Sequence, residues 1–386
     1  SRVKAERSGS WKQNLHGELA YKSFIPAPLP PRPGLAFDEE MTALLLKAHQ
    51  RLAYLEGKNS MIPNLNLFVS MYVRKEALLS SQIEGTQATL EDVLDPSVDE
   101  NTNRSVADVI NYIKATEFAL KRMESLPLCG RLIRETHAVL MRGVRGQEKT
   151  PGKFRISQNW IGGSGCALKN ARYVPPAPED MAACMSELEK YINDEGDETD
   201  ALIKAALIHY QFETIHPFLD GNGRVGRLLI TLYLLKTAVL TAPALYVSYF
   251  LKKNRIEYYD RMSEVRRRGD YEQWVKFFLR ALCESAEDAI STIDRLSALH
   301  LRCIELIGKE PRNQNMLAIF SYLEKNPIIE INKTSKDMGL AYNTVARSVS
   351  FFIEKGLLEQ KKRGRTRIFH YSQYLAILRK DTENLP

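Results

Sequence analysis

The sequence lacks long apolar runs and paired cysteines. No apolar run approaches the roughly 18 residues that a membrane-spanning helix needs, and the N-terminus has no signal-peptide core. The five cysteines are odd in number, scattered and never spaced as C-x-x-C, which argues against a disulfide framework or a zinc site. These absences favour a cytoplasmic globular protein with reduced thiols and no membrane partner.

Length and charge set wider bounds. At 386 residues the chain exceeds one typical core, so two or three domains are expected. The net charge of +7 suggests an acidic partner such as ATP, nucleic acid or an acidic protein, without choosing among them. The polar, basic residues 1–10 are set aside as a disordered arm.

One stretch, HPFLDGNGRVGR at residues 216–227, concentrates unusual chemistry. Its glycines let backbone N–H groups approach an anion, and the apolar run 228–235 predicts a helix whose N-terminus points at that anion. The glycines also satisfy G-x-G-x-x-G, but a dinucleotide fingerprint must follow a strand, and residues 200–215 have helical spacing. A plain helix–helix turn would explain the glycines, but not the carboxylate, amide and arginines beside them.

The stretch resembles the Fic signature, HxFx(D/E)GN(G/K)RxxR, at every defined position. Members of that family are mostly protein adenylyltransferases, which move AMP from ATP to a hydroxyl of a target protein. The resemblance implies a mainly α fold, a Fic-type helical bundle with a β-hairpin flap. It also implies ATP as substrate and a dimer that tunes autoinhibition.

The residue types suit that reaction. His216 would take the proton of the attacking hydroxyl, and Asp220 would supply one carboxylate to Mg²⁺. Asn222 and neighbouring N–H groups would face the α-phosphate, and two arginines would clamp the outer phosphates. Phe218 would anchor the loop in the core. The expected phosphate-binding set is Gly221, Asn222, Gly223, Arg224, Gly226 and Arg227.

A second motif, SSQIEG, ends a helix predicted at 65–83. Ser80 and Glu84 share one helix face, and a carboxylate at a helix C-terminus needs a partner to offset the dipole. The pattern resembles the inhibitory helix of Fic proteins, (S/T)xxxE(G/N), which implies that Glu84 pairs with Arg227 and blocks productive seating of the γ-phosphate. Alternatively, Glu84 is a solvated helix end.

Glycines 162–165 separate two strand-like runs, 156–161 and 171–174, and predict a hairpin. The resemblance implies a flap that registers the target segment by strand addition. Trp160 and Ile161 would contact the target, although Trp160 also fits a core position.

Three smaller predictions concern single side chains. Lys153 and Arg155 are further candidates for positioning phosphate. The N-x-x-x-Y-Y pattern of Asn254, Tyr258 and Tyr259 resembles the adenosine wall, with one tyrosine in the core. His137, in an apolar stretch, is expected to be a satisfied core histidine.

Periodicity predicts further helices at 38–56, ended by Gly57, and at 106–122, 130–140, 179–193 and 272–308. The Pro-rich residues 19–37 predict an extended clasp. Near the C-terminus, helices at 313–324, 333–338 and 342–355 precede a basic tip at 361–365 and a strand at 366–371. This order favours a winged helix.

In that winged helix, Asn343, Thr344 and Arg347 would face the major groove of DNA. The helix that bears them is poor in basic residues, so dimerisation or protein contacts are the alternative. The expected domains are an N-terminal clasp and inhibitory region (1–105), a Fic core (106–305) and the winged helix (306–386).

Three functional hypotheses follow. The first is an autoinhibited, Mg²⁺- and ATP-dependent protein adenylyltransferase that also modifies itself. The second uses Glu84 to orient a water that removes AMP from modified targets. The third is a DNA-binding regulator in which the Fic core senses nucleotide.

Overall fold

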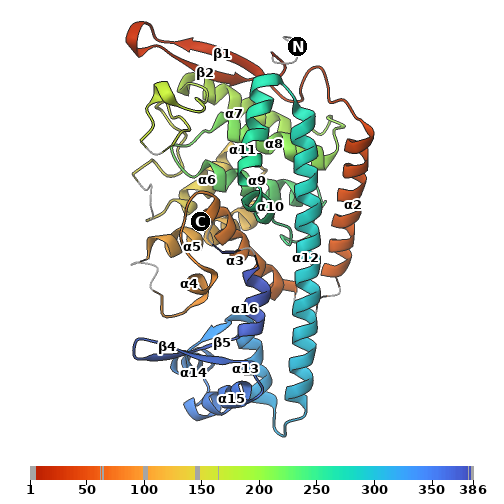
Figure 1. Cartoon of the computed structure of the whole chain (residues 1–386), viewed down its shortest axis with the longest axis vertical. Helices are drawn as coiled ribbons and strands as arrows, with labels where there is room; N and C mark the ends of the chain where they lie inside the picture. The colour runs from red at the N-terminus through yellow and green to blue at the C-terminus, as the bar shows by residue number, and fades with distance from the viewer. Residues whose placement is uncertain are drawn as a thin grey trace. The chain divides into compact units, whose positions relative to one another are not determined.

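A computed structural model describes residues 6–60, 62, 65–98, 103–143, 148–163, 165–380 and 382–383. The fold is mainly α-helical, as expected, with one two-stranded and one three-stranded sheet among the described residues (Figure 1). None of the described helices is both long and apolar enough to cross a bilayer.

The chain forms two compact units, each built from two separate segments. The first contains Ser1–Tyr54 and Asn111–Ala286, and the second contains Leu55–Ile110 and Glu287–Pro386. The chain therefore passes between the units after residues 54, 110 and 286.

Helix α8 (Ala201–Ile215) is the centre of the first unit. Asp200 caps it by accepting a hydrogen bond from the Leu202 N–H at 2.8 Å. Every residue of α8 after Ala201 is buried, as expected for a helix whose apolar residues surround its axis. Helix α9 (Asn222–Lys236) packs against it, and the Trp274 indole donates to the Ala206 carbonyl oxygen at 2.9 Å.

The other helices of this region largely match the predicted ranges. They are α5 (Arg104–Arg122), α6 (Gly130–Leu140), α7 (Pro178–Ile192) and α12 (Tyr271–Gly308). A further helix, α11 (Arg255–Arg268), precedes α12. The short α10 (Ser248–Lys253) was not expected. Helix α2 (Glu39–Asn59) runs through Gly57, so the prediction that Gly57 ends it was wrong; one glycine inside a helix costs only about 1 kcal/mol.

A strand pair replaces part of the expected clasp. Strand β1 (Gly9–Asn14) runs antiparallel to β2 (Tyr21–Pro26). Setting aside residues 1–10 was therefore wrong for Gly9 and Ser10, while residues 1–5 lie outside the described part. Strand β2 also reaches Val174, whose carbonyl accepts the Phe24 N–H at 2.9 Å.

The expected flap hairpin is reduced to one antiparallel bridge, between Ile161 and Tyr173. Ser164, at the expected hairpin tip, lies outside the described residues. The preceding run, residues 156–161, has no strand beyond this bridge. The side chains of Arg155 and Asn159 bond there to the backbone of residues 215–218. A short 3₁₀ helix, Leu168–Asn170, occupies part of the segment between the bridge partners.

In the second unit, α3 (Leu65–Ile83) matches its predicted range. Helix α4 (Leu90–Leu94) follows, with a capping box formed by Thr89 and Asp92. Its Leu94 packs on a small core of Ile328, Ile368 and Leu375, residues that lie more than 230 positions away along the chain.

The C-terminal segment has the predicted helices and two elements that were not predicted. The predicted helices are α13 (Gln314–Lys325), α14 (Ile331–Met338) and α15 (Tyr342–Glu354). Strands β4 (Glu359–Arg363) and β5 (Thr366–His370) form an antiparallel pair, joined by the unexpected β3 (Ile328–Ile329) in the order β3-β5-β4. The unexpected α16 (Ser372–Arg379) follows.

Candidate active site

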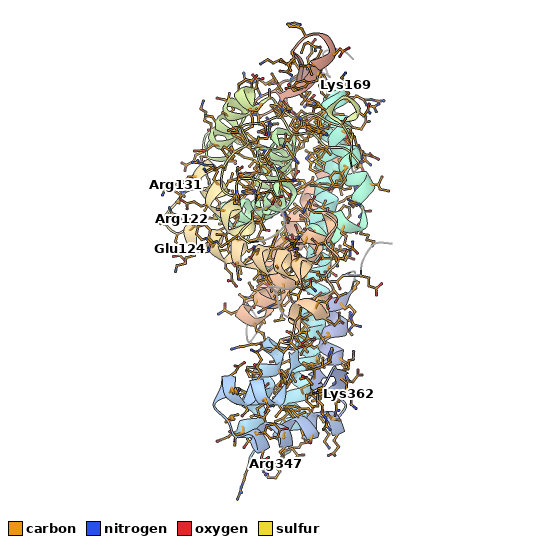
Figure 2. The ribbon with its side chains drawn as sticks, turned by 90° about the vertical axis from the view of Figure 1, so that its left-hand side faces the viewer. Arg122, Glu124, Arg131, Lys169, Arg347 and Lys362 are labelled. Carbon is orange, nitrogen blue, oxygen red and sulfur yellow. The ribbon has the colours of Figure 1, made fainter. Side chains whose placement is uncertain are left out.

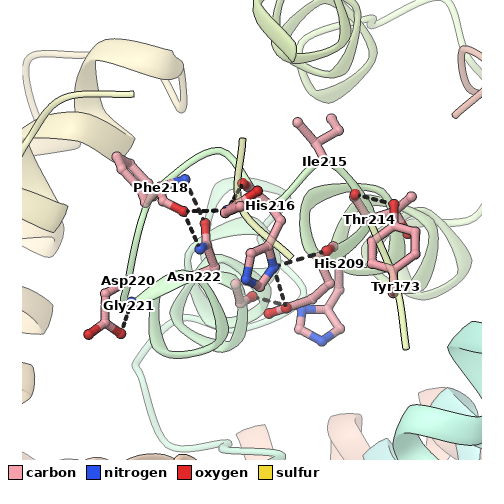
Figure 3. Close-up of polar contacts among 12 residues, drawn as sticks. Tyr173, His209, Thr214, Ile215, His216, Phe218, Asp220, Gly221 and Asn222 are labelled. Carbon is pink, nitrogen blue, oxygen red and sulfur yellow. Dashed lines mark hydrogen bonds and ion pairs between the residues drawn. The ribbon is translucent and has the colours of Figure 1, made fainter. Parts of the chain in front are cut away.

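The loop between α8 and α9 begins and ends with a left-handed residue. His216 terminates α8 at φ 51°, and Gly221 precedes α9 at φ 81° (Figure 3). A Cβ on Gly221 would lie 3.0 Å from the Met141 sulfur and 3.4 Å from the His137 ring. Both the backbone conformation and the crowding therefore require glycine at position 221.

Asn222 holds the loop in shape. Its Oδ1 accepts the Phe218 N–H and its Nδ2 donates to the Phe218 carbonyl, both at 2.8 Å. Asn159 reinforces the turn by donating to the carbonyls of Phe218 (2.9 Å) and His216 (3.2 Å). We expected the Asn222 amide at the α-phosphate; it is buried and bonded to the loop backbone. Asn159 belongs to no motif of the sequence, so its role was not expected.

His137 packs against the loop and hydrogen-bonds to it. His137 stacks on Phe218 with ring centroids 3.7 Å apart and planes 3° apart. Its Nδ1 accepts the Gly152 N–H, so Nε2 carries the proton and donates to the Asp220 carbonyl at 2.8 Å. Burial lowers the pKa of His137 to about 4. The predictions of a core histidine and a core Phe218 are confirmed.

Arg155 also supports the loop. Its guanidinium donates to the carbonyls of His216 (2.9 Å), Ile215 (3.3 Å) and Pro176 (2.5 Å), and burial lowers its pKa to about 10. Because these carbonyls use its donors, Arg155 positions the loop, whereas we expected it to position phosphate. The other candidate, Lys153, is exposed.

The His216 ring has a defined tautomer. Its Nδ1 lies 3.3 Å from the Glu213 carbonyl oxygen, which can only accept a hydrogen bond. The neutral ring therefore carries its proton on Nδ1 and has its lone pair on Nε2. The Glu213 carboxylate is buried, with Oε2 4.0 Å from Nδ1. Glu213 was missed because an acidic residue inside an apolar helix carries no recognisable motif.

The first turn of α9 faces the same loop. The N–H groups of Asn222, Gly223 and Arg224 belong to the helix start, where no intrahelical acceptor is available. The helix dipole adds a partial positive charge there. Arg224 is buried, and its guanidinium lies 3.7 Å from Asp220 Oδ1. This arrangement suits an anion such as phosphate.

Asp220 could serve one metal ion. Its side chain is 34% exposed, and Oδ1 accepts the Gly221 N–H at 2.6 Å. No group of three or more acidic, histidine or cysteine side chains in the described residues could hold a metal by itself. A single carboxylate fits Mg²⁺ that arrives with nucleotide phosphates and keeps several waters.

The last two residues of the expected phosphate-binding set, Gly226 and Arg227, are buried in α9. A Cβ on Gly226 would meet Glu213 Oε1 at 2.4 Å, and the Gly226 carbonyl accepts from His209 Nδ1 at 2.9 Å. Gly226 therefore allows α8 and α9 to approach closely, although we expected it to bind phosphate. Arg227 is 1% exposed.

The expected adenosine wall divides into a buried and a half-buried tyrosine. Tyr258 is fully buried, and its hydroxyl donates to His209 Nε2 at 2.7 Å, so it is the tyrosine that belongs to the core. Tyr259 is half-buried, with Arg255 over its ring. Asn254 is half-buried, and its amide donates to the Phe250 carbonyl at 3.0 Å. Tyr259 and Asn254 thus remain candidates for nucleoside contact.

The expected target-docking residues lie at the surface of the first unit. Trp160 is 41% exposed, and its indole donates to the Cys166 carbonyl at 2.7 Å. Ile161 is half-buried in the single bridge. Trp160 is therefore exposed, and the alternative prediction that it lies in the core was wrong.

Ser80 and Glu84 belong to the second unit. Ser80 is buried near the end of α3, and Glu84 follows the last helical residue. The turn there is closed by hydrogen bonds from the Glu84 N–H to the Ser81 carbonyl and from the Gly85 N–H to the Gln82 carbonyl. The pairing of Glu84 with Arg227 stays a prediction.

Comparison with known families agrees with this geometry. Residues 127–234 match the Fic/DOC family, and residues 42–121 match the Fic/DOC family N-terminal region. The chain contains a Fic domain. The first match spans α6 to α9, including the loop described above, and the second includes α3 with Ser80 and Glu84.

Among curated relatives, the protein adenylyltransferase Fic of Drosophila yakuba is 33% identical over 127 residues. That of Aedes aegypti is 35% identical over the same length. Each match covers 33% of this chain and 22% of the relative. This chain therefore matches about a fifth of each relative, around the Fic domain.

A solved structure has the same fold over most of the chain. The Fic family protein from Desulfovibrio desulfuricans G20 superposes with a TM-score of 0.56 at 22% identity. The match covers 87% of this chain and 97% of that one. The likeness establishes a Fic-type fold.

Proposed function

We propose that the protein is an adenylyltransferase that moves AMP from ATP to a Ser, Thr or Tyr hydroxyl of a target protein. The observation that carries this proposal is the loop after α8, which connects His216, with its ring proton directed to the Glu213 carbonyl, to the start of α9. The relatives named protein adenylyltransferase Fic support the same reaction.

The reaction balances with groups of this loop. The target hydroxyl oxygen attacks the α-phosphorus while its proton passes to His216 Nε2. The new O–P bond forms as the bond to the β-phosphate oxygen breaks, and pyrophosphate leaves. The N–H groups at the start of α9 stabilise negative charge on the α-phosphate oxygens, and Arg224 and Arg227 bind the leaving phosphates.

Asp220 would hold Mg²⁺ together with the phosphates of ATP. The ion would neutralise charge on those phosphates. The role of Asn222, Phe218, His137 and Arg155 is to fix the loop so that the Nε2 lone pair and the helix start keep their relative positions.

Glu84 is proposed as a brake on transfer. Paired with Arg227, its carboxylate would prevent the γ-phosphate from taking its productive position. The match to the Fic/DOC N-terminal region across α3 supports this assignment. The same carboxylate could instead orient a water that removes AMP from a modified target; release of AMP that disappears in Glu84→Gly would identify this second activity.

The test compares wild type, Glu84→Gly and His216→Ala by intact mass after incubation with ATP and Mg²⁺. We expect AMP adducts to accumulate in Glu84→Gly through auto-modification and to be low in wild type. Adding His216→Ala to Glu84→Gly should lower the adduct rate by at least about a hundredfold, the usual contribution of a general base.

Unchanged melting temperatures would show that the variants fold. Full transfer in the double variant would disprove His216 as the base. Equal rates in wild type and Glu84→Gly would disprove the brake. A gain of mass from a different nucleotide donor, without any gain from ATP, would disprove AMP transfer.

A further inference from the structure

The C-terminal segment of the second unit has a helix-turn-helix followed by a two-stranded hairpin. Helix α14 ends at Gly339, which has the left-handed conformation at φ 64°, and α15 begins three residues later at Tyr342. Strands β4 and β5 follow, and β3 joins them on the other edge of β5. This order of elements is that of a winged helix, in which the second helix of the turn enters the major groove.

Two cations face each other across the hairpin. Lys362 on β4 pairs in register with Arg367 on β5, so both side chains lie on the same face, and both are exposed. Neither forms an ion pair with any residue that the structure describes. Like charges directly opposite each other cost stability, so the pair calls for a reason outside the fold.

Protection of a sheet edge accounts for single cations, but not for two that face each other. Lysines on edge strands block unwanted strand pairing, and β4 is an edge strand. Arg367 lies on β5 outside the pairing with β3, which involves only Phe369 and His370 of β5. The exposed Lys361 and Arg365 add further positive charge at the hairpin, which favours an anionic partner.

Helix α15, which precedes this hairpin in the sequence, has a stripe of exposed polar residues. Asn343, Arg347 and Ser350 are exposed at helical spacing, whereas Val345, Val349 and Phe352 are buried on the other face. Arginine and asparagine are the side chains that most often read guanine and adenine in the major groove. Arg347 and Lys362 both lie at the surface of this unit (Figure 2).

We propose that residues 314–370 form a winged-helix domain that binds duplex DNA. In this proposal α15 lies in the major groove with Asn343 and Arg347 toward the base edges, and Lys362 and Arg367 contact the phosphate backbone. This binding function is separate from the chemistry at His216.

The test measures binding of the full chain to fluorescent duplex DNA at several salt concentrations. The test variant is Lys362→Gln/Arg367→Gln. The matched control is Arg295→Gln/Lys325→Gln, which removes the same charge from exposed positions on α12 and α13 in the same unit. Circular dichroism and thermal unfolding of both variants confirm their folding.

We expect wild type and control to bind alike. The test variant should bind roughly ten- to a hundredfold more weakly at 0.1 M salt, with a salt slope smaller by about 2, since each phosphate contact contributes about 0.9. Equal weakening in both variants would show attraction by net charge alone and overturn the proposal. Absence of duplex binding at low salt would also overturn it and leave the hairpin to an acidic protein partner.

Discussion

Three histidines near the site have different roles because their surroundings differ. His137 and His209 are buried, and each uses both ring nitrogens in hydrogen bonds within the protein. His216 is partly exposed, with its proton directed to a carbonyl. This difference in exposure supports the proposal that His216 exchanges a proton with substrate, while the other two hold the helices and the loop around it.

The buried histidines predict a pH dependence of stability. Burial lowers the pKa of His137 from 6.5 to about 4 and that of His209 to about 3. As the pH falls through 6.5, these two histidines therefore take up protons in the unfolded chain but stay neutral in the folded chain. We expect the free energy of unfolding to fall below pH 6.5 by roughly 1.4 kcal/mol per pH unit for each histidine until about pH 4.

Denaturant unfolding between pH 7.5 and 4.5 would measure this slope. His137→Gln should reduce it by about one proton's contribution. His300 is the control, because its hydrogen bond to Glu324 raises its pKa. Its contribution to stability is complete below pH 6.5 and is lost as the pH rises above that value. His300→Gln should therefore lower the free energy of unfolding by a constant amount below pH 6.5 and leave the acid slope unchanged. Equal acid slopes in wild type and His137→Gln would contradict the prediction.

The close packing of α8 and α9 fixes the site at the scale of elements. The two helices are joined by the loop that holds His216, and Gly226 lets them approach one turn after that loop. A wider separation would move the start of α9 away from Glu213 and His216, which both belong to the end of α8. Gly226 is thus required by packing, whereas Gly221 is required by its backbone conformation.

We expect Gly226→Ala to lower the free energy of unfolding by about 1–3 kcal/mol, the usual cost of an added methyl in a tight core. AMP transfer should fall as well, because the added Cβ overlaps Glu213 Oε1. Thermal unfolding and adduct formation by intact mass would measure both effects in the Glu84→Gly background.

Gly57→Ala is the matched control for that substitution. Gly57 lies inside α2, and a Cβ there would meet nothing within 4 Å. The control should therefore raise stability by up to about 1 kcal/mol. An unchanged or higher stability of Gly226→Ala would contradict the packing role of Gly226.

Over the whole molecule, each unit joins segments that are far apart in the sequence. Buried polar groups form hydrogen bonds and ion pairs between those segments. In the first unit, Arg7 forms an ion pair with Glu272 at 3.0 Å and donates to the carbonyls of Pro33, Gly34 and Gly269. In the second, the Gln82 amide donates to the Thr382 carbonyl at 2.8 Å. Both contacts span more than 250 residues of sequence.

Arg7→Ala should therefore destabilise the first unit although Arg7 lies near the start of the chain. Glu272 would lose its cation in a largely buried setting, and three carbonyls would lose donors, for a cost of about 2–4 kcal/mol. Chemical denaturation followed by tryptophan fluorescence would measure this loss of stability. Trp274 is a suitable probe because it is fully buried and lies two residues after Glu272 in the sequence.

Arg7→Lys is the conservative comparison. Lysine keeps the charge but lacks the planar fork that serves several acceptors at once, so we expect it to recover only part of the loss. Full recovery by lysine would show that the charge alone matters, and no loss in Arg7→Ala would show that the contact does not stabilise the unit.

The sequence by itself determined the helical class, most helix ranges and the signature loop. Helical periodicity extends over many residues in α3, α8 and α12, and apolar spacing marks such helices without tertiary information. The residue types of 216–227 likewise indicated phosphate chemistry, because few other sites need a base, a carboxylate, glycines and arginines together.

The tertiary structure alone decided which of those residues hold the loop and the helices around it. Asn222 and Arg155 were expected at the phosphates, but their side chains bond to backbone groups brought close by the fold. Gly226 was expected there as well, and it packs against the Glu213 and Phe212 side chains. The strand pair β1–β2, the single bridge at Ile161 and the support from His137 also depend on partners distant in sequence. A sequence pattern carries residue chemistry and local periodicity, whereas these contacts arise only when separate segments pack together.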